Sequence, residues 1–244
     1  MRNNQNFLKA LKLAQAVSDD SSGVIIGINP TFPATSYGYI EMGAEIKKFG
    51  KMKAFKIKRF VEKPDYEKAK EFLTSRRYLW NSGISIWKAQ KFIALFKKYL
   101  PKHFKALMEV KKYFNKEEFN EIAAKKFKNL EPIAIDYAIY ENAKDLATVS
   151  ADLGWSDIGN WAILKEILLS SNKLEKNWIK GKHTGIDTKN CLILGGERLV
   201  TTLGLEDLII IDTDDAILIA NKNQAEKVKE LTQKLKKDGF EDYL

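Results

Sequence analysis

The sequence has little cysteine, little histidine and no long apolar run. Cys191 is the single cysteine among 244 residues, so a fold held together by disulfides is excluded. The histidines, His103 and His183, have no metal-like spacing to each other or to Cys191, which argues against a zinc enzyme. No apolar run approaches the roughly 18 residues that span a bilayer, so no membrane partner is expected.

The N-terminal segment also lacks the features of a secretory signal. Residues 1–17 have an amphipathic helical pattern without an apolar centre or a cleavage site. Together with the scarcity of cysteine, this predicts a reduced, cytoplasmic protein. Hydrophobic residues make up 45% of the chain, too many for a disordered polypeptide. The length allows one large domain, alone or with a small appendage.

Positive charge is in excess. Lys and Arg total 41 and Asp and Glu 32, which gives a formal charge of +9. Lysine supplies most of it, in helical stretches such as 97–114 and 227–240. We interpret these stretches as solvated helix faces, because a nucleic-acid groove favours clustered Arg with interleaved exposed aromatic residues. No nucleic-acid partner is therefore predicted.

The order of elements predicts an α/β fold. A helix is expected over 6–17, followed by a continuous apolar run from Val24 to Ile28 that suits a strand buried on both faces. Further extended segments are expected at 37–46, 54–61, 78–87 and 146–151, and helices at 65–75, 88–128 with a break at Pro101, 135–142 and 160–169.

The pattern changes beyond residue 170. Short runs of β-forming residues, separated by turn residues, predict a small β-roll or short β-helix, and a terminal helix capped by Asn221 follows. We therefore expect a boundary near 170–176, with one domain at 1–170 and a second at 177–244. The four runs are 191–194, 199–203, 208–211 and 216–219.

Glu62, Lys63 and Pro64 follow a predicted strand. A glutamate accepts hydrogen bonds from hydroxyl groups, and a lysine beside it offers a point charge to a phosphate. The pair is thus suited to a phosphorylated polyol. The alternative is a solvated strand end, where Pro64 only ends the strand because it cannot donate a backbone hydrogen bond.

Two more short motifs contain glycine. In Tyr37-Gly38-Tyr39, the glycine allows the backbone to approach a ligand closely, or it is an ordinary turn residue. Asn81-Ser82-Gly83 interrupts an apolar stretch, where its polar groups serve either a bulge or ligand hydroxyls.

Asp157 lies between Gly154 and Gly159, just before a predicted helix. A carboxylate in such a turn can bind a hard cation such as Mg²⁺. Alternatively, Asp157 or Asn160 caps the helix. Neither a nucleophile elbow nor a glycine-rich phosphate loop is present, since Gly195-Gly196 falls between predicted strands.

The order of these motifs resembles the bacterial mannose-1-phosphate guanylyltransferases, also called GDP-mannose pyrophosphorylases. The likeness covers nearly the whole chain. The matching segments are 30–41, 60–65, 80–84, 135–141, 154–159 and 204–222.

The resemblance implies a Rossmann-like, GT-A-like nucleotidyltransferase with a mixed sheet and a small C-terminal β-roll or left-handed β-helix-like domain. It also implies transfer of GMP from GTP to mannose 1-phosphate with Mg²⁺, giving GDP-mannose and pyrophosphate. Among the many lysines, only Lys63 is expected to have a specific phosphate role, and the others are expected to be solvated surface residues. By resemblance, Glu62 holds mannose hydroxyls, Lys63 holds the sugar phosphate, and Asn81 and Gly83 line the sugar pocket. The turn at Tyr37 and Gly38 presents backbone to the sugar, and Asp157 is one of two metal-binding aspartates.

The sequence departs from the family at its start. The family's glycine-rich signature and its Asp-His pair do not occur here, so we expect a chain that lacks the N-terminal nucleotide-binding part and is inactive alone. The strand at Val24–Ile28 could then be an unprotected edge, which predicts a homodimer or a complementing N-terminal chain. The alternative function is a non-catalytic remnant that binds sugar phosphate, or a subunit that complements a separate N-terminal half.

Overall fold

The computed structural model describes residues 1, 3–171 and 177–243. The chain forms two compact units, Met1–Ser156 and Asp157–Leu244. The boundary expected near 170–176 lies largely outside the described residues. In the structure the division comes earlier, so helix α6 (Trp161–Ser171) goes with the second unit.

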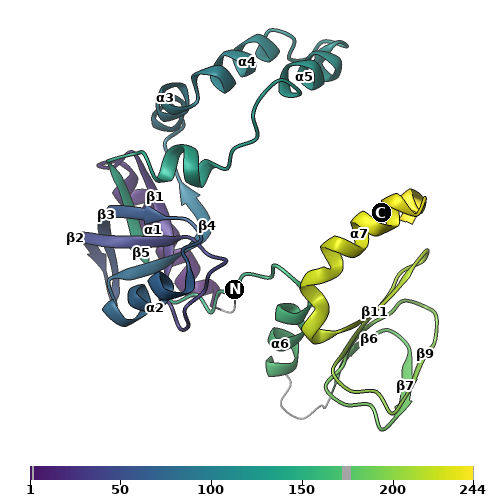
Figure 1. The fold of residues 1–244 in the computed structure, drawn as a ribbon. Coiled ribbons are helices and arrows are strands. Elements are labelled where there is room, and N and C mark those ends of the chain that lie inside the picture. The colour runs from purple at the N-terminus through teal and green to yellow at the C-terminus, as the bar shows by residue number, and fades with distance from the viewer. Residues whose placement is uncertain (2, 172–176, 244) are drawn as a thin grey trace. The chain divides into compact units, whose positions relative to one another are not determined.

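Five strands of the first unit close into a barrel in the order β1-β4-β2-β3-β5 (Figure 1). β1 pairs in parallel with β5, and the other neighbouring pairs are antiparallel. This arrangement confirms the expected mixed sheet. The strands are β1 (Gly23–Ile28), β2 (Tyr39–Phe49), β3 (Met52–Val61), β4 (Tyr78–Ile86) and β5 (Leu146–Ser150).

The expectation that Val24–Ile28 would be an unprotected edge is wrong. β1 pairs with β4 on one side and with β5 on the other, and all its residues are buried. Val24 and Ile26 belong to one apolar cluster, whereas Ile25 belongs to another. Both faces of this strand are therefore covered, as its continuous apolar sequence predicts.

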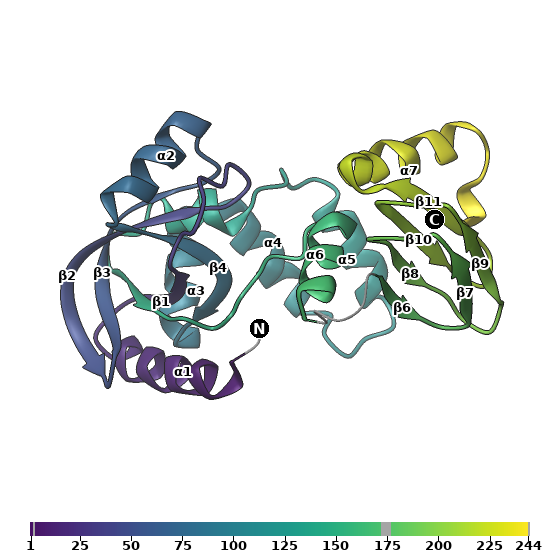
Figure 2. The same cartoon turned by 90° about the horizontal axis from the view of Figure 1, so that it is seen from below.

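Helix α1 (Asn4–Ser18) covers the first of these clusters, because its buried positions repeat at helical spacing. Helix α2 (Tyr66–Ser75) packs on the same cluster (Figure 2). The Asp65 side chain caps α2 by accepting a hydrogen bond from the Lys68 backbone N–H at 2.9 Å. The buried positions of α1 include Ala10, Leu13, Ala14 and Val17.

Three helices follow β4 along the chain: α3 (Ala89–Tyr99), α4 (Pro101–Lys111) and α5 (Phe119–Phe127). Pro101 opens α4, where the missing N–H costs nothing. Phe92 and Leu95 of α3 pack against the second cluster, beside a π-helix, η1 (Asp136–Tyr140). The side chains of α3 thereby anchor this helical segment to the barrel.

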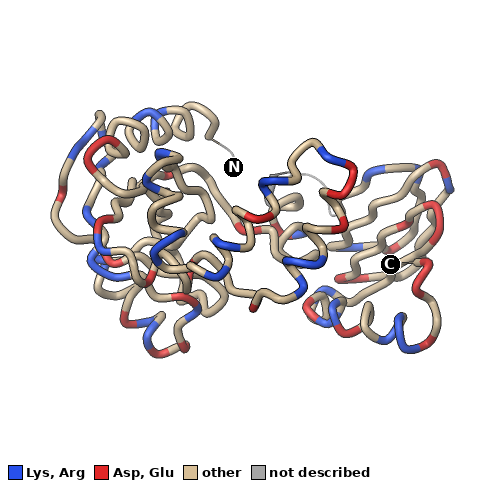
Figure 3. Tube along the Cα trace, turned by 90° about the horizontal axis from the view of Figure 1, so that it is seen from above, with Lys and Arg blue, Asp and Glu red and all other residues tan. Residues whose placement is uncertain are grey.

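Most of the net positive charge lies in this helical segment. Between residues 88 and 128 there are twelve lysines and four glutamates. Neither α3 nor α5 has a fully buried residue, which agrees with solvated helix faces. Figure 3 shows the Lys and Arg positions along the chain trace.

Among the described residues, none of the helices combines the length and the apolar character that a bilayer crossing requires.

The second unit is a β-helix-like stack of short strands, as expected for the C-terminal part. β6, β8 and β10 lie in parallel, β11 runs antiparallel to β10, and β7 pairs in parallel with β9. Strands β6 and β7 were not expected from the sequence. The strands are β6 (Trp178–Lys180), β7 (His183–Ile186), β8 (Leu192–Leu194), β9 (Val200–Leu203), β10 (Leu208–Asp212) and β11 (Ile217–Asn221).

The C-terminal helix differs slightly from its expected form. Asn221 is the expected cap and accepts a hydrogen bond from the Asn223 N–H at 2.9 Å. The first turns form a 3-10 helix, η2 (Lys222–Lys227), and the α-helix α7 (Val228–Lys237) follows, with a last short turn η3 (Glu241–Tyr243).

Candidate functional site

Two backbone hydrogen bonds bring three of the sequence motifs together in the first unit. The carbonyl oxygen of Tyr37 accepts from the Lys63 N–H at 3.2 Å, and that of Gly38 accepts from the Asn81 N–H at 2.8 Å. The segment before β2 is thus held between the end of β3 and the middle of β4. Each of these carbonyl oxygens accepts one protein hydrogen bond and keeps a second lone pair, so the backbone contact with a sugar that the resemblance implies stays a prediction.

Gly38 is needed where it stands. A Cβ atom at this position would lie 2.5 Å from Glu62 Oε2 and 2.8 Å from Phe60 Cζ. Both distances are below a normal van der Waals contact, so any side chain would displace the Glu62 carboxylate. The sequence motif therefore reflects a close approach between backbone and carboxylate.

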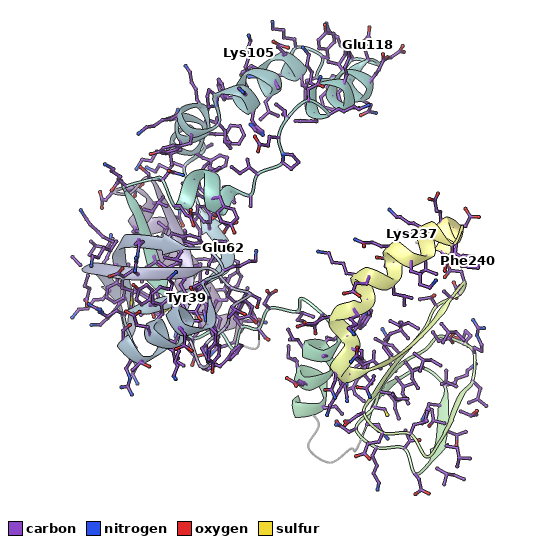
Figure 4. The ribbon with its side chains drawn as sticks, in the orientation of Figure 1. Tyr39, Glu62, Lys105, Glu118, Lys237 and Phe240 are labelled. Atoms are coloured by element: carbon purple, nitrogen blue, oxygen red, sulfur yellow. The ribbon has the colours of Figure 1, made fainter. Side chains whose placement is uncertain are left out.

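The Glu62 carboxylate lies directly after β3 and is only 9% exposed, so it is not a solvated strand end (Figure 4). Its Oε1 pairs with Lys63 Nζ at 2.9 Å. Its Oε2 is buried and has no hydrogen-bond partner among the described residues. A buried carboxylate oxygen without a donor is an acceptor available to a ligand hydroxyl.

Lys63 presents its ammonium group to solvent, with a side-chain exposure of 57%. Its backbone has a φ of 47°, a left-handed conformation that few residues other than glycine adopt. The hydrogen bond and charge of Glu62 raise the pKa of Lys63, with smaller contributions from Tyr137 and Asp136. The amine is therefore charged at neutral pH and available to an anionic group.

The Asn81 side chain is fixed at both ends. Its Nδ2 donates to Asp136 Oδ1 at 2.9 Å, and its Oδ1 accepts from the Gly83 N–H at 3.0 Å. The strand is bulged here, because the pairing of β1 with β4 shifts register and Ser82 Oγ donates to the Ile26 carbonyl at 2.7 Å. Gly83 has a φ of 73° and open space where a Cβ would be. The triplet is thus a bulge that also orients an amide.

Asp136 and Glu141 are site residues that sequence reasoning did not assign. Asp136 orients Asn81, and Glu141 Oε1 accepts from the Glu62 N–H at 3.3 Å. Asp136 is the first residue of the π-helix η1 and Glu141 follows its last, and π-helical turns occur often at functional sites. The 135–141 segment was part of the family resemblance, which was the one signal that could have identified these carboxylates.

The Tyr37 ring belongs to an aromatic cluster. It lies edge-on to Trp80 with ring centres 5.2 Å apart and to Trp155 at 5.7 Å, and Phe32 packs on Trp80 at 4.8 Å. Tyr37 is only 9% exposed, so its ring is mainly a wall of the core beside the site.

Asp157 is assigned to the second unit and is exposed. Asn160, not Asp157, caps α6, because Asn160 Oδ1 accepts from the Ile163 N–H at 3.0 Å. Within the described ranges, no group of three or more His, Cys, Asp or Glu side chains could hold a metal ion. Magnesium sites in nucleotide chemistry combine one or two carboxylates with substrate phosphates. Asp157 therefore fits as one ligand and not as a complete site.

The first-unit site combines several hydrogen-bond acceptors with one exposed positive charge. Glu62 pairs with Lys63, Asp136 accepts from Asn81, and Glu141 accepts from the Glu62 backbone N–H. Acceptors suit ligand hydroxyl groups, and the exposed ammonium suits an anionic substituent on the same ligand. The arrangement is chemically matched to a phosphorylated polyol.

Comparison with protein families gives two matches along the chain. Residues 2–173 match the nucleotidyl transferase model. Residues 181–235 match the model described as the mannose-phosphate isomerase/GMP-like β-helix domain. The first match covers the barrel unit and continues through α6 of the second unit, and the second match lies within the β-helix-like unit.

Curated relatives are similar over the entire chain. A putative mannose-1-phosphate guanylyltransferase of Vibrio cholerae serotype O1 is 32% identical over 244 residues, which are 100% of this chain and 51% of the relative. A mannose-1-phosphate guanylyltransferase of Escherichia coli K12 is 33% identical over 97% of this chain and 49% of its own length. The chain thus spans about half the length of the curated relatives it matches.

Solved structures support the same fold. A Thermus thermophilus protein described as mannose-1-phosphate geranyltransferase superimposes with a TM-score of 0.75 and 28% identity, covering 96% of this chain and 66% of its own. A mannose-6-phosphate isomerase of Helicobacter pylori reaches a TM-score of 0.53 at 27% identity, over 64% of this chain and 60% of its own.

Proposed function

Because the chain belongs to the nucleotidyl transferase family, we propose that it carries the sugar-phosphate side of a mannose-1-phosphate guanylyltransferase. The proposed reaction transfers GMP from GTP to mannose 1-phosphate and yields GDP-mannose and pyrophosphate. The observation that carries the proposal is the Glu62–Lys63 pair, which sets a buried free acceptor beside an exposed ammonium group.

Glu62 and Lys63 have separate roles in this proposal. Glu62 Oε2 accepts a hydrogen bond from a mannose hydroxyl and thereby gains the partner it lacks. Lys63 Nζ binds the phosphate of the sugar, and this contact orients the attacking oxygen. Asp136 acts through Asn81, whose amide it holds in one orientation, and Gly83 keeps the space beside that amide open.

Mg²⁺ is the proposed cofactor, and Asp157 is the residue of this chain that would bind it. When bound, the ion would neutralise charge on the reacting phosphates. The residues of this chain bind and orient the acceptor sugar phosphate, and no nucleophilic side chain is required for such a transfer.

Binding of mannose 1-phosphate to the 244-residue chain, measured by titration calorimetry, tests the proposal. The wild type should bind with one site. Lys63→Ala should weaken binding at least tenfold, or about 1.4 kcal/mol. Lys68→Ala is the matched control, because Lys68 is 62% exposed and pairs with the neighbouring Asp65 at 3.0 Å in the same way. Equal affinity in all three proteins would contradict the role of Lys63.

Mannose without phosphate separates the two contacts. Mannose should bind more weakly than mannose 1-phosphate, and Lys63→Ala should leave the affinity for mannose unchanged. Glu62→Gln should reduce the affinity for mannose, since the amide offers one acceptor oxygen instead of two. In a longer family enzyme, Lys63→Ala should raise KM for mannose 1-phosphate. An unchanged KM would count against a phosphate contact.

Turnover is tested with GTP, mannose 1-phosphate and Mg²⁺. We expect the 244 residues alone to bind the sugar phosphate without forming GDP-mannose, and measurable product would contradict this expectation. Binding without turnover in every longer form would instead support a non-catalytic sugar-phosphate binder. The predicted homodimer is checked by light scattering of the purified protein, and a purified protein that is monomeric would leave the complementing N-terminal chain as the predicted partner.

A further inference from the structure

A second lysine–carboxylate cluster lies in the β-helix-like unit, outside the site described above. Lys165 of helix α6 is 2% exposed, although a solvated surface role was expected for every lysine except Lys63. Its Nζ lies 3.6 Å from Asp207 Oδ1, which is beyond the roughly 3.2 Å limit of a good N–H···O hydrogen bond. The expectation of a solvated lysine is therefore wrong here, because α6 packs this side chain onto the β-helix.

The same carboxylate oxygen is already shared. Asp207 Oδ1 accepts from Lys222 Nζ at 2.9 Å and from Asn190 Nδ2. The Lys165 ammonium, with its three donors, is left buried without any hydrogen-bond partner among the described residues. A structural ion pair explains the approach to Asp207 but not three unsatisfied donors, since buried donors without partners are rare and costly.

A cavity of about 320 Å³ adjoins this cluster. A water molecule takes about 30 Å³, so the cavity has room for a small ion with several waters. Glu166 also lines the cavity, but it is exposed and forms no ion pair with a described residue, so it is not directly paired with either lysine. The cavity is lined by Ala162, Lys165, Glu166, Leu169, Asn190, Lys222 and Asn223.

We propose that this cavity is a binding site for a small oxyanion, a phosphate or a carboxylate group, which accepts hydrogen bonds from Lys165 and Lys222. Two ammonium groups facing one carboxylate leave one positive charge to be compensated. Asn190 and Asn223 line the cavity and offer amide donors for further oxygens of the ligand. Burial lowers the pKa of Lys165 and Asp207 raises it, so a bound anion would favour the charged amine.

Inorganic phosphate and acetate, titrated separately into the full chain at constant ionic strength, test the site. The NMR signals of the backbone amides of Asn190, Lys222 and Asn223, and of the two asparagine side-chain amides, report binding in the cavity. They distinguish an anion bound in the cavity from phosphate bound at Lys63. We expect saturable shifts in the wild type and in Lys63→Ala. The anion that binds more tightly identifies the ligand as a phosphate or a carboxylate.

Lys165→Met removes the buried charge and keeps the volume of the side chain. We expect it to weaken anion binding at least tenfold, whereas Lys182→Met, which alters a lysine that is 61% exposed and paired with Glu197, should have no effect. If Lys165→Met does not fold, Lys222→Met provides the same comparison. The absence of saturable shifts in the wild type, or equal affinity in the folded variants, would overturn the proposal.

Discussion

The two units of the molecule each set a lysine next to a carboxylate, with opposite consequences. In the first unit, Lys63 is exposed and hydrogen-bonded to the buried Glu62, which raises its pKa. In the second unit, Lys165 is buried and Asp207 is partly exposed, and burial lowers the pKa of this lysine. The exposed lysine is a ready contact for a ligand, whereas the buried one is a group that lacks an acceptor.

The comparison shows that the buried member of a lysine–carboxylate pair decides which ligand group the pair can bind. Burying the carboxylate of Glu62 leaves a free oxygen acceptor, which suits hydroxyl groups. Burying the ammonium of Lys165 leaves free donors, which suit an oxyanion. We therefore predict that ligand binding at each site requires only that the unit containing that site is folded.

Leu192→Ala should have the largest effect and tests whether the two units are independent. Leu192 is fully buried in β8, so truncation should cost the second unit about 2–5 kcal/mol of unfolding free energy. Urea unfolding followed by circular dichroism measures this, and Leu199→Ala is the control because Leu199 is 58% exposed. Mannose 1-phosphate affinity should not change, and loss of that affinity would show that the sugar site depends on the second unit.

Gly38→Ala should have the next largest effect and is confined to the first unit. The added Cβ displaces the Glu62 carboxylate, so mannose 1-phosphate should bind at least tenfold more weakly, about 1.4 kcal/mol. Gly196→Ala is the control, since nothing lies within 4 Å of a Cβ built there. Calorimetry checks the affinity, and a Gly38→Ala protein that binds like the wild type would mean that Glu62 does not hold the sugar.

The smallest expected effect concerns the pH dependence of the free energy of unfolding, to which the two lysines should contribute with opposite sign. Because the pKa of Lys165 is lowered from 10.5, the folded state binds fewer protons than the unfolded state at pH values between the lowered pKa and 10.5. Stability of the wild type should therefore rise with pH from the lowered pKa up to 10.5, relative to Lys165→Met. The charged neighbours of Lys165 in this comparison are Asp207 and Lys222.

Lys63 should show the opposite sign. Its pKa is raised above 10.5, so its stabilising contribution is complete below pH 10.5 and is lost as the pH rises through the raised value. Unfolding by urea between about pH 7 and 11, with Lys165→Met and Lys63→Ala beside the wild type, measures both dependences. If the unfolding free energy changed with pH in the same way in all three proteins, the predicted difference between the Lys63 and Lys165 pairs would be wrong.

Much of the local structure could be predicted from the sequence, because periodicity and turn chemistry are local. The apolar run at Val24–Ile28 is a strand buried on both faces, Asp65 caps α2 and Pro101 opens α4. Strands β6 and β7 could not be predicted in this way. They have only three and four residues, and their parallel pairing with β8 and β9 defines them as strands.

The candidate site was predicted in part. The motifs containing Gly38, Glu62 and Asn81 were identified, and the structure brings them together through the backbone bonds around Tyr37. Asp136 was not assigned, since its contact with Asn81 joins residues 55 positions apart. Contacts over such separations depend on the register of β4 against the barrel, which no local pattern encodes.

From the order of its amino acids alone, this protein is an α/β chain with a β-helix-like C-terminal part and a lysine suited to a phosphate at position 63. Only the tertiary structure distinguishes Lys165 from the other lysines. In the sequence it is one more polar residue in a helix, and its burial follows from the packing of α6 on the β-helix. Solvent exposure is a property of the assembled fold, and it decides which partner of an ion pair is left to bind a ligand.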